Sequence, residues 1–253
     1  MNPRTLLALS TLAASASLTP TATQAAEITV MSSVAIKDAY LELVPAFEKA
    51  TGHKVVTLWV PTVEMMMRLK TDEQVDLVLM AVSNVEELTR LGKLAAGTRV
   101  DVVKSGIGVA IRKGAPKPDI GSAAGLKSTL LAAKSISYST GPSGVYLVGL
   151  FERMGIADAI KPKIKQVQGV PVAELVARGE VEIGFQQISE ILPVEGAELA
   201  GPLPAEVQSI TTFAAALRPG ARQAEAAQAW VQFLTAPAAA AVIRKHGLQP
   251  ARA

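Results

Sequence analysis

The stretch Glu27-Ile28-Thr29-Val30-Met31-Ser32-Ser33 decides the fold, because it has the pattern of a β-strand that ends in a serine turn. Residues 35–50 follow with apolar side chains at helical spacing, and Gly52 is placed to end that helix as a left-handed C-cap. Where a strand passes through a short turn into a helix, the first backbone N–H groups of the helix have no carbonyl partner. Such a turn favours the binding of an anion.

Strands and helices continue to alternate as far as residue 112. Strands are predicted over residues 54–60, 75–80 and 106–112, and the second is nearly all apolar, as in a parallel strand buried on both faces. Pro61 and Thr62 open one helix, and Ser83 with Glu86 three residues later predicts a capping box at the start of another. This alternation predicts an α/β fold in which parallel-rich sheets are flanked by helices.

Two segments rich in Pro and Gly, residues 114–118 and 201–204, interrupt this pattern. Between them we predict helices over 126–133, 144–154 and 172–177 and strands over 135–139, 164–167 and 182–186. After them we predict a strand over 207–217 and helices over 223–234 and 238–246. We therefore expect one lobe from residues 26–112 plus 207–253 and a second from 113–206. The two crossings would form a hinge, with a cleft at the carboxyl ends of the strands.

Residues 1–25 have the features of a secretory signal peptide. Arg4 precedes an apolar run over residues 6–12, and Thr23 and Ala25 are small residues suited to cleavage after Ala25. The sequence contains no cysteine, so we expect no disulfide and no lipid anchor of the kind attached to a cysteine. A free protein of the periplasm of a Gram-negative bacterium fits these features best.

Composition and motifs exclude several classes of function. Without Arg4 the chain has 24 basic and 22 acidic residues, since the full count is 25 and 22, and no basic run is interleaved with aromatic residues. Nucleic acid is therefore not an expected partner. The sequence contains no HExxH motif, no G-x-S-x-G motif and no cluster of metal ligands, so we expect neither a metal nor a cofactor.

Four predicted strand ends supply candidate ligand-binding residues. These are Ser32 and Ser33, then Thr62, then Thr140, Gly141, Ser143, Gly144 and Val145, and finally Gln186 and Gln187. Each group also has a structural explanation as a helix cap, a helix start, a turn or a solvated pair. Their agreement in position favours a site, and their neutral donors predict that it binds a small anion through dipoles rather than through ion pairs.

Four segments, over residues 47–55, 75–78, 139–144 and 177–185, carry a resemblance to a known family. The chain resembles the periplasmic solute-binding proteins of ABC importers, in the molybdate-binding-protein-like branch. The resemblance implies the two-lobed periplasmic-binding-protein fold of type II, closing around one ligand. It also implies a monomer with an inner-membrane ABC permease as partner.

The predicted ligand differs from that of the molybdate binders. Ala35 stands where they carry a first serine, Thr62 where they carry a second, and Gln187 where they carry a tyrosine. These changes favour an organic di- or tricarboxylate over molybdate, captured for import. The alternative is an aconitate isomerase, which interconverts trans- and cis-aconitate and is similar to this branch. Such an enzyme needs a base, for which the candidates are Tyr146, Glu64 and Glu190, while Ser33, Ser143 and Gln187 would hold carboxylates.

Overall fold

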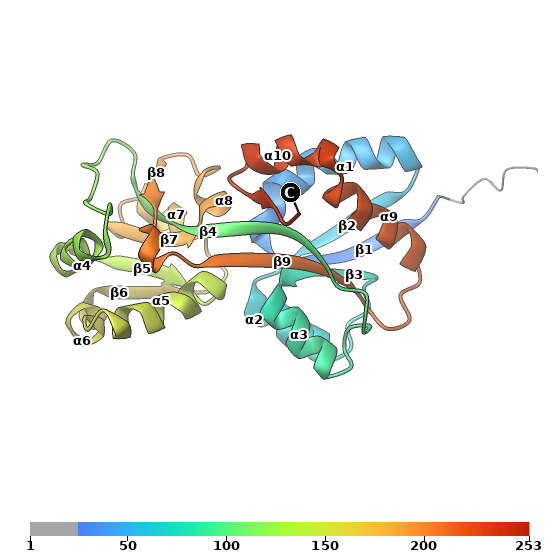
Figure 1. Ribbon diagram of the computed structural model, residues 1–253, viewed down its shortest axis with the longest axis horizontal. Helices are drawn as coiled ribbons and strands as arrows, with labels where there is room; N and C mark the ends of the chain where they lie inside the picture. The colour runs from blue at the N-terminus through green and yellow to red at the C-terminus, as the bar shows by residue number, and fades with distance from the viewer. Residues whose placement is uncertain (1–24, 253) are drawn as a thin grey trace, which may run out of the picture.

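The computed structural model describes residues 25–252, so the predicted signal peptide lies outside the described residues apart from Ala25. Two lobes lie side by side and are joined by two long strands, β4 (Val100–Arg112) and β9 (Ile210–Leu217) (Figure 1). Each lobe is a section of mixed sheet flanked by helices. The predicted two-lobed α/β fold is confirmed.

Lobe 1 is built on the strand order β2-β1-β3-β9-β4. The strands β1 (Glu27–Ser32), β2 (Lys54–Trp59) and β3 (Leu77–Ala81) are parallel, so their carboxyl ends meet at one edge of the sheet. On one face, α1 (Lys37–Thr51), α9 (Ala224–Thr235) and α10 (Ala240–Lys245) enclose a core around Trp230. On the other face, α2 (Thr62–Lys70) and α3 (Val82–Arg90) pack with apolar side chains such as Met65. The short strand β10 (Gln249–Pro250) pairs with β4.

Lobe 2 continues the sheet in the order β4-β7-β5-β6. Its strands are β5 (Ile136–Ser139), β6 (Ile164–Val167), β7 (Ile183–Gln187) and β8 (Ala197–Pro202). Its helices are α4 (Ala123–Ala132), α5 (Pro142–Arg153), α6 (Ala157–Ile160), α7 (Val172–Ala177) and α8 (Ile188–Ile191). Phe151 and Phe185 pack in its core with ring centroids 6.2 Å apart. Because β5 and β7 are parallel, the loops after them lie at the same edge of the sheet.

The strand β4 belongs to both lobes. It pairs with β9 over Val100–Gly106 and with β7 and β8 over Ile107–Arg112. The side chain of Gln208 fastens the second crossing to the first, since its Oε1 accepts from the N–H of Ile107 at 2.9 Å and its Nε2 donates to the Ile107 carbonyl at 3.0 Å. The lobe boundaries at residues 112 and 207 stay a prediction, and the change of pairing partner lies within β4, between Gly106 and Ile107.

Three details of the predicted secondary structure are wrong. Ser83 does not cap a helix, because α3 begins at Val82 directly after β3 and no side chain caps it. The segment 201–204 is not wholly a break, because β8 runs to Pro202 and pairs with β4 alone, at a sheet edge where proline is tolerated. The last long strand begins at Ile210 rather than at residue 207, since residues 205–207 form the 3-10 turn η3 (Ala205–Val207).

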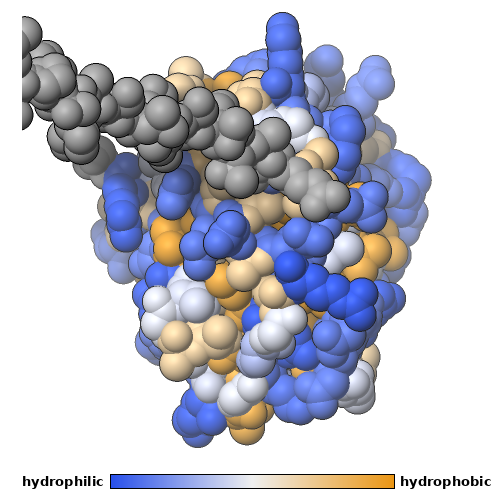
Figure 2. Space-filling view, turned by 90° about the vertical axis from the view of Figure 1, so that its right-hand side faces the viewer, coloured by the Kyte–Doolittle hydropathy of each residue, from blue (hydrophilic) through white to orange (hydrophobic). Residues whose placement is uncertain are grey.

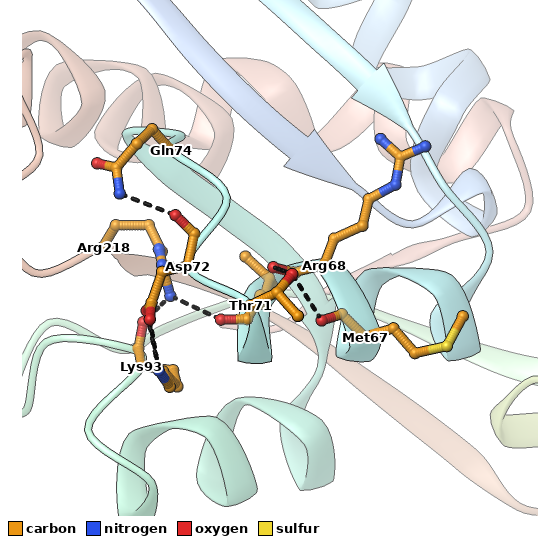
Figure 3. Close-up of polar contacts among 8 residues, drawn as sticks. Met67, Arg68, Thr71, Asp72, Gln74, Lys93 and Arg218 are labelled. Carbon is orange, nitrogen blue, oxygen red and sulfur yellow. Dashed lines mark hydrogen bonds and ion pairs between the residues drawn. The ribbon is translucent and has the colours of Figure 1, made fainter.

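A polar cluster joins three segments of lobe 1 at the sheet edge opposite the serine turn (Figure 3). The buried guanidinium of Arg218, just after β9, donates to the carbonyl oxygens of Leu69 and Lys93 and to the carboxylate of Asp72. Lys93 Nζ also donates to both Asp72 oxygens, at 2.8 and 2.9 Å. Hydrogen bonds from Arg218 thereby connect the segments that follow α2 and α3 to the end of β9.

The end face of lobe 1 is mainly hydrophilic, with apolar residues scattered over it (Figure 2). Within residues 25–252 no single helix has the length and apolar content to cross a membrane, and only the pair α9 and η4–α10 (Pro237–Lys245), bent by 57°, meets both criteria together. Trp230 and Leu234 of that pair are buried in the core of lobe 1.

Candidate ligand-binding cleft

A cavity of about 610 Å³ lies between the two lobes. Lobe 1 contributes the serine turn, the start of α1, the start of α2 and the side chains of Trp59 and Phe213. Lobe 2 contributes the loop from Ser139 to Ser143, the loop before α7, and the segment after β7. The cavity therefore lies at the carboxyl ends of the parallel strands of both lobes, where open α/β sheets bind ligands.

The two serines after β1 have different surroundings. Ser33 lines the cleft and begins the 3-10 turn η1 (Val34–Ile36), where its Oγ accepts from the N–H of Ala35 at 3.3 Å. Ser32 is fully buried outside the cleft lining, and its Oγ donates to the Ser33 carbonyl at 3.3 Å. Successive residues of a strand point to opposite faces, so only one of the two can face the cavity. The structure does not place Ser32 at the cleft.

The start of α2 lies on the same wall of the cleft. Pro61 has extended backbone angles before the helix, and both Pro61 and Thr62 line the cavity. Glu64 lies two residues after Thr62, about 200° around the helix, and forms an ion pair with Arg68 outside the cleft lining. The structure therefore places the candidate base Glu64 outside the cleft lining.

The loop after β5 supplies the wall of lobe 2. Thr140, Gly141 and Ser143 line the cavity, and the N–H of Gly141 donates to Ser139 Oγ at 3.2 Å. The helix α5 begins at Pro142, two residues earlier than predicted. The N–H groups of Ser143 and Gly144 consequently belong to its first turn, where a helix provides no carbonyl partner. Of these two residues Ser143 lines the cavity, so its N–H is a donor that an anion in the cleft could use.

The remaining candidates on α5 do not line the cavity. Gly144 packs against the end of β5, where a Cβ atom would overlap the carbonyl oxygen of Ser139. Val145 is 70% exposed and lines a neighbouring groove. Tyr146 turns away, and its hydroxyl donates to the carbonyl of Val207 at 2.9 Å. Because each helical residue is rotated by about 100° from the last, a run of adjacent residues cannot all face one cleft.

The end of β7 brings both predicted glutamines to the cleft. Gln186 Oε1 accepts from the N–H of Ala173 at 3.1 Å, and its Nε2 donates to Glu190 Oε1 at 3.1 Å. Gln187 Nε2 donates to Thr211 Oγ1 of β9 at 3.0 Å, while its buried Oε1 has no partner among the described residues. The alternative of a solvated pair does not hold, because both amides are buried and they bond different partners.

Glu190 lies on the short helix α8, which follows β7 without a loop and touches the serine turn of lobe 1. The hydroxyl of the preceding Ser189 donates to the carbonyl of Ala35 at 2.6 Å, a bond between the lobes. Burial raises the pKa of the Glu190 carboxyl to about 7, against the smaller lowering effect of hydrogen bonds from the Gln186 side chain and the Gln187 backbone. Of the three candidate bases, Glu190 is the one that lines the cleft.

The raised pKa of Glu190 has a measurable effect on stability. The folded carboxyl titrates near pH 7 and its ordinary value is 4.5, so folding favours its protonated form. The contribution of Glu190 to the unfolding free energy therefore decreases as the pH rises from the unfolded pKa. The decrease is complete above the folded pKa. At 1.36 kcal/mol per pKa unit, we expect the unfolding free energy to fall by about 2–3 kcal/mol more in the wild type than in Glu190→Gln between pH 5 and pH 8. Urea unfolding of both proteins at several pH values measures this, and parallel curves would contradict it.

Apart from Glu190, sequence reasoning missed the charged and aromatic residues of the cleft. Lys37 and Asp38 lie in the first turn of α1, while Glu174 and Glu195 come from lobe 2. Trp59 could have been found, since it is the last residue of β2 and occupies the position next to Ser32 in the register. In the part of the chain that the structure describes, no group of three or more Asp, Glu or His side chains is placed to hold a metal.

Comparison with known proteins gives concordant results. The model of the family described as bacterial extracellular solute-binding protein matches residues 28–249. An aconitate isomerase from a Pseudomonas species is 39% identical over 229 residues, which cover 88% of this chain and 87% of the relative. The molybdate-binding protein ModA of Azotobacter vinelandii is 28% identical over 240 residues, covering 92% and 93%. The solved structure of the sulfate-binding protein SubI from Mycobacterium tuberculosis H37Rv has a TM-score of 0.75 at 16% identity, covering 90% of this chain and 88% of that one, which is a likeness of fold.

Proposed function

We propose that this chain, which belongs to the bacterial extracellular solute-binding protein family, binds an organic tricarboxylate between its lobes and interconverts trans- and cis-aconitate. The observation that carries the proposal is the Glu190 carboxyl on the cleft wall, whose pKa of about 7 leaves both protonation states populated near neutral pH. The relative named aconitate isomerase supports the same substrate. Sequence alone had favoured a transport receptor.

The donors around the cavity suit a ligand with several carboxylates. Ser33 and Thr62 on lobe 1 face Thr140, Gly141 and Ser143 on lobe 2. Lys37 supplies the single ammonium group in the lining, and the free N–H groups at the start of α5 add dipoles. A ligand held from both walls would stabilise the closed arrangement by its differential affinity for it.

The isomerisation requires one proton to move within the substrate. Aconitate has a methylene group beside its carbon–carbon double bond. The Glu190 carboxylate would take one methylene proton, and the electron pair left behind would form a new double bond to the central carbon. The former double bond would then accept the proton from Glu190 at its outer carbon. The carboxylate is thereby restored, and the double bond of the product lies on the other side of the central carbon, where its geometry can be cis. Atoms and charge balance, because the proton taken from one carbon is returned to another.

The test is to incubate residues 26–253 with trans-aconitate in D₂O and follow the proton NMR spectrum. We expect cis-aconitate to appear and deuterium to enter the methylene position, since the Glu190 proton exchanges with solvent. A thermal-shift series with citrate, both aconitates, molybdate, tungstate and sulfate measures binding independently. A shift by the aconitates without conversion would exclude the isomerase and leave a receptor. A shift by molybdate alone would exclude the carboxylate site.

The second candidate is a substrate-binding protein for an ABC importer. Membership of the family and the relative ModA favour it. In either case we propose export through the predicted signal peptide over residues 1–25 and work in the periplasm as a monomer. The receptor additionally requires an inner-membrane permease that recognises the closed lobes.

Two serine substitutions test the walls of the site. We expect Ser33→Ala and Ser143→Ala each to weaken binding of trans-aconitate about fivefold, because each removes a hydroxyl at the cavity worth about 1 kcal/mol. Ser32→Ala is the matched control, since its hydroxyl lies outside the cleft lining, and we expect its affinity to match the wild type. Titration calorimetry measures all three. Unchanged affinity in both cleft variants would remove these hydroxyls from the site.

A further inference from the structure

We propose that Gln186 is a positioning residue, whose amide is oriented by the backbone of α7 and in turn fixes which oxygen of Glu190 is free to exchange a proton in the cleft. The catalytic use of that proton rests on the proposed function, whereas the orientation itself does not. Gln186 is 3% exposed and lies on β7, four residues before Glu190.

The orientation of the Gln186 amide follows from its partners. The N–H of Ala173 can only donate, so the group that faces it at 3.1 Å must be the amide oxygen. The amide nitrogen of Gln186 must then face Glu190, where it lies 3.1 Å from Oε1. A backbone donor in the first turn of a helix has no helical partner of its own, so Ala173 is available for this task. A flipped amide would set its NH2 group against the N–H of Ala173 and its oxygen against Oε1 of the Glu190 carboxylate.

The consequence for Glu190 is an unequal pair of oxygens. Oε1 accepts from Gln186 Nε2, which is the one side-chain hydrogen bond to this carboxyl among the described residues, and the Gln187 backbone is a further donor to it. We therefore assign the exchangeable proton to Oε2. A donor held against a carboxylate stabilises the ionised form, which opposes the effect of burial on its pKa. Gln186 thereby keeps part of Glu190 ionised near neutral pH, and a base must be ionised to accept a proton.

Among the described residues, the charged groups near Glu190 do not donate to its carboxyl as the Gln186 amide does. Lys37, Asp38, Glu174 and Glu195 line the same cavity. The other elements packed against α8 carry Asp101, Lys104 and Arg112 on β4 and Glu198 on β8. Within residues 25–252 none of them forms an ion pair with Glu190, whose side-chain hydrogen bond comes from Gln186.

The test measures the titration of Glu190 directly by carbon NMR on protein labelled at the glutamate carboxyl, with the signal assigned by its loss in Glu190→Gln. We expect Gln186→Met to raise the midpoint by about one pKa unit, because it removes a hydrogen bond to a charged group. Gln186→Glu keeps the acceptor for Ala173 but removes the donor and adds a second carboxyl, so we expect a larger rise. This second variant answers the question if Gln186→Met does not fold.

Gln187→Met is the matched control, because Gln187 is an equally buried amide on the same strand whose nitrogen bonds Thr211 instead. We expect its Glu190 midpoint to equal that of the wild type. Equal midpoints in the wild type and both Gln186 variants, or the same rise in Gln187→Met, would overturn the inference. The pH profile of isomerisation should move with the NMR midpoint. A moving midpoint in a protein that does not isomerise aconitate would refute the proposed function and leave the role of Gln186 intact.

Discussion

Glu190→Gln is expected to lower the rate of aconitate isomerisation by about 10²–10⁴-fold, the range found when a positioned general base is removed. Glutamine keeps the size of the side chain and can still contact Gln186, so we expect the affinity for trans-aconitate to change little. The loss should therefore fall on kcat rather than on KM. Turnover of the wild type should rise with pH through a midpoint of about 7, as the carboxyl ionises.

Glu64→Gln and Tyr146→Phe are the controls for this result. Both residues satisfied the sequence criteria for a base, yet Glu64 pairs with Arg68 and Tyr146 bonds the carbonyl of Val207, outside the cleft lining. We expect both variants to turn over substrate at the rate of the wild type. Full activity in Glu190→Gln, or its loss in either control, would assign the base elsewhere.

Gly144→Ala is expected to destabilise the protein by about 3 kcal/mol. A Cβ atom at Gly144 would overlap the backbone carbonyl oxygen of Ser139, which cannot move aside by changing rotamer. The start of α5 would have to shift away from β5, and overpacking of this kind costs about 1–3 kcal/mol or more. Chemical denaturation at pH 7 measures the difference.

Gly149→Ala lies on the same helix and serves as the control. Its Cβ would approach only the guanidinium of Arg153 at 3.1 Å, the far end of a flexible side chain. Alanine is favoured over glycine within a helix by about 0.5–1 kcal/mol, so we expect equal or slightly higher stability. A Gly144→Ala protein as stable as this control would show that α5 does not need its close approach to β5.

The order of strands and helices could be predicted because local patterns carry it. Residues 27–60 show the clearest case, since the predicted strands, helix and Gly52 cap agree with β1, α1, β2 and the left-handed Gly52. Weak local signals failed at Ser83, where β3 runs directly into α3 and the serine falls inside the helix. Local signals also gave a wrong prediction at β8. Gly201 and Pro202 indicated a break, but both belong to the strand, which tolerates them because it lies at a sheet edge.

The sequence predicted which strand ends form the site. It did not predict which side chains at those ends line the cleft. Ser33, Thr62 and Ser143 come after strands and Gln187 is the last residue of one, and all four line the cleft at the carboxyl ends of those strands. Ser32, Gly144, Val145, Tyr146 and Glu64 are close neighbours of these in sequence and lie outside its lining. Sequence distance does not say which face of a strand or helix a side chain takes up.

By itself, therefore, the sequence determined the α/β class, the two lobes and the family, because periodicity and short motifs are local properties of the chain. Only the tertiary structure decided which of the three possible bases lines the cleft. It also decided that Gln186 bonds both the backbone of Ala173 and the carboxyl of Glu190. Those contacts depend on how β7, α7 and α8 pack together, and burial, the physical cause of the raised Glu190 pKa, exists only after that packing.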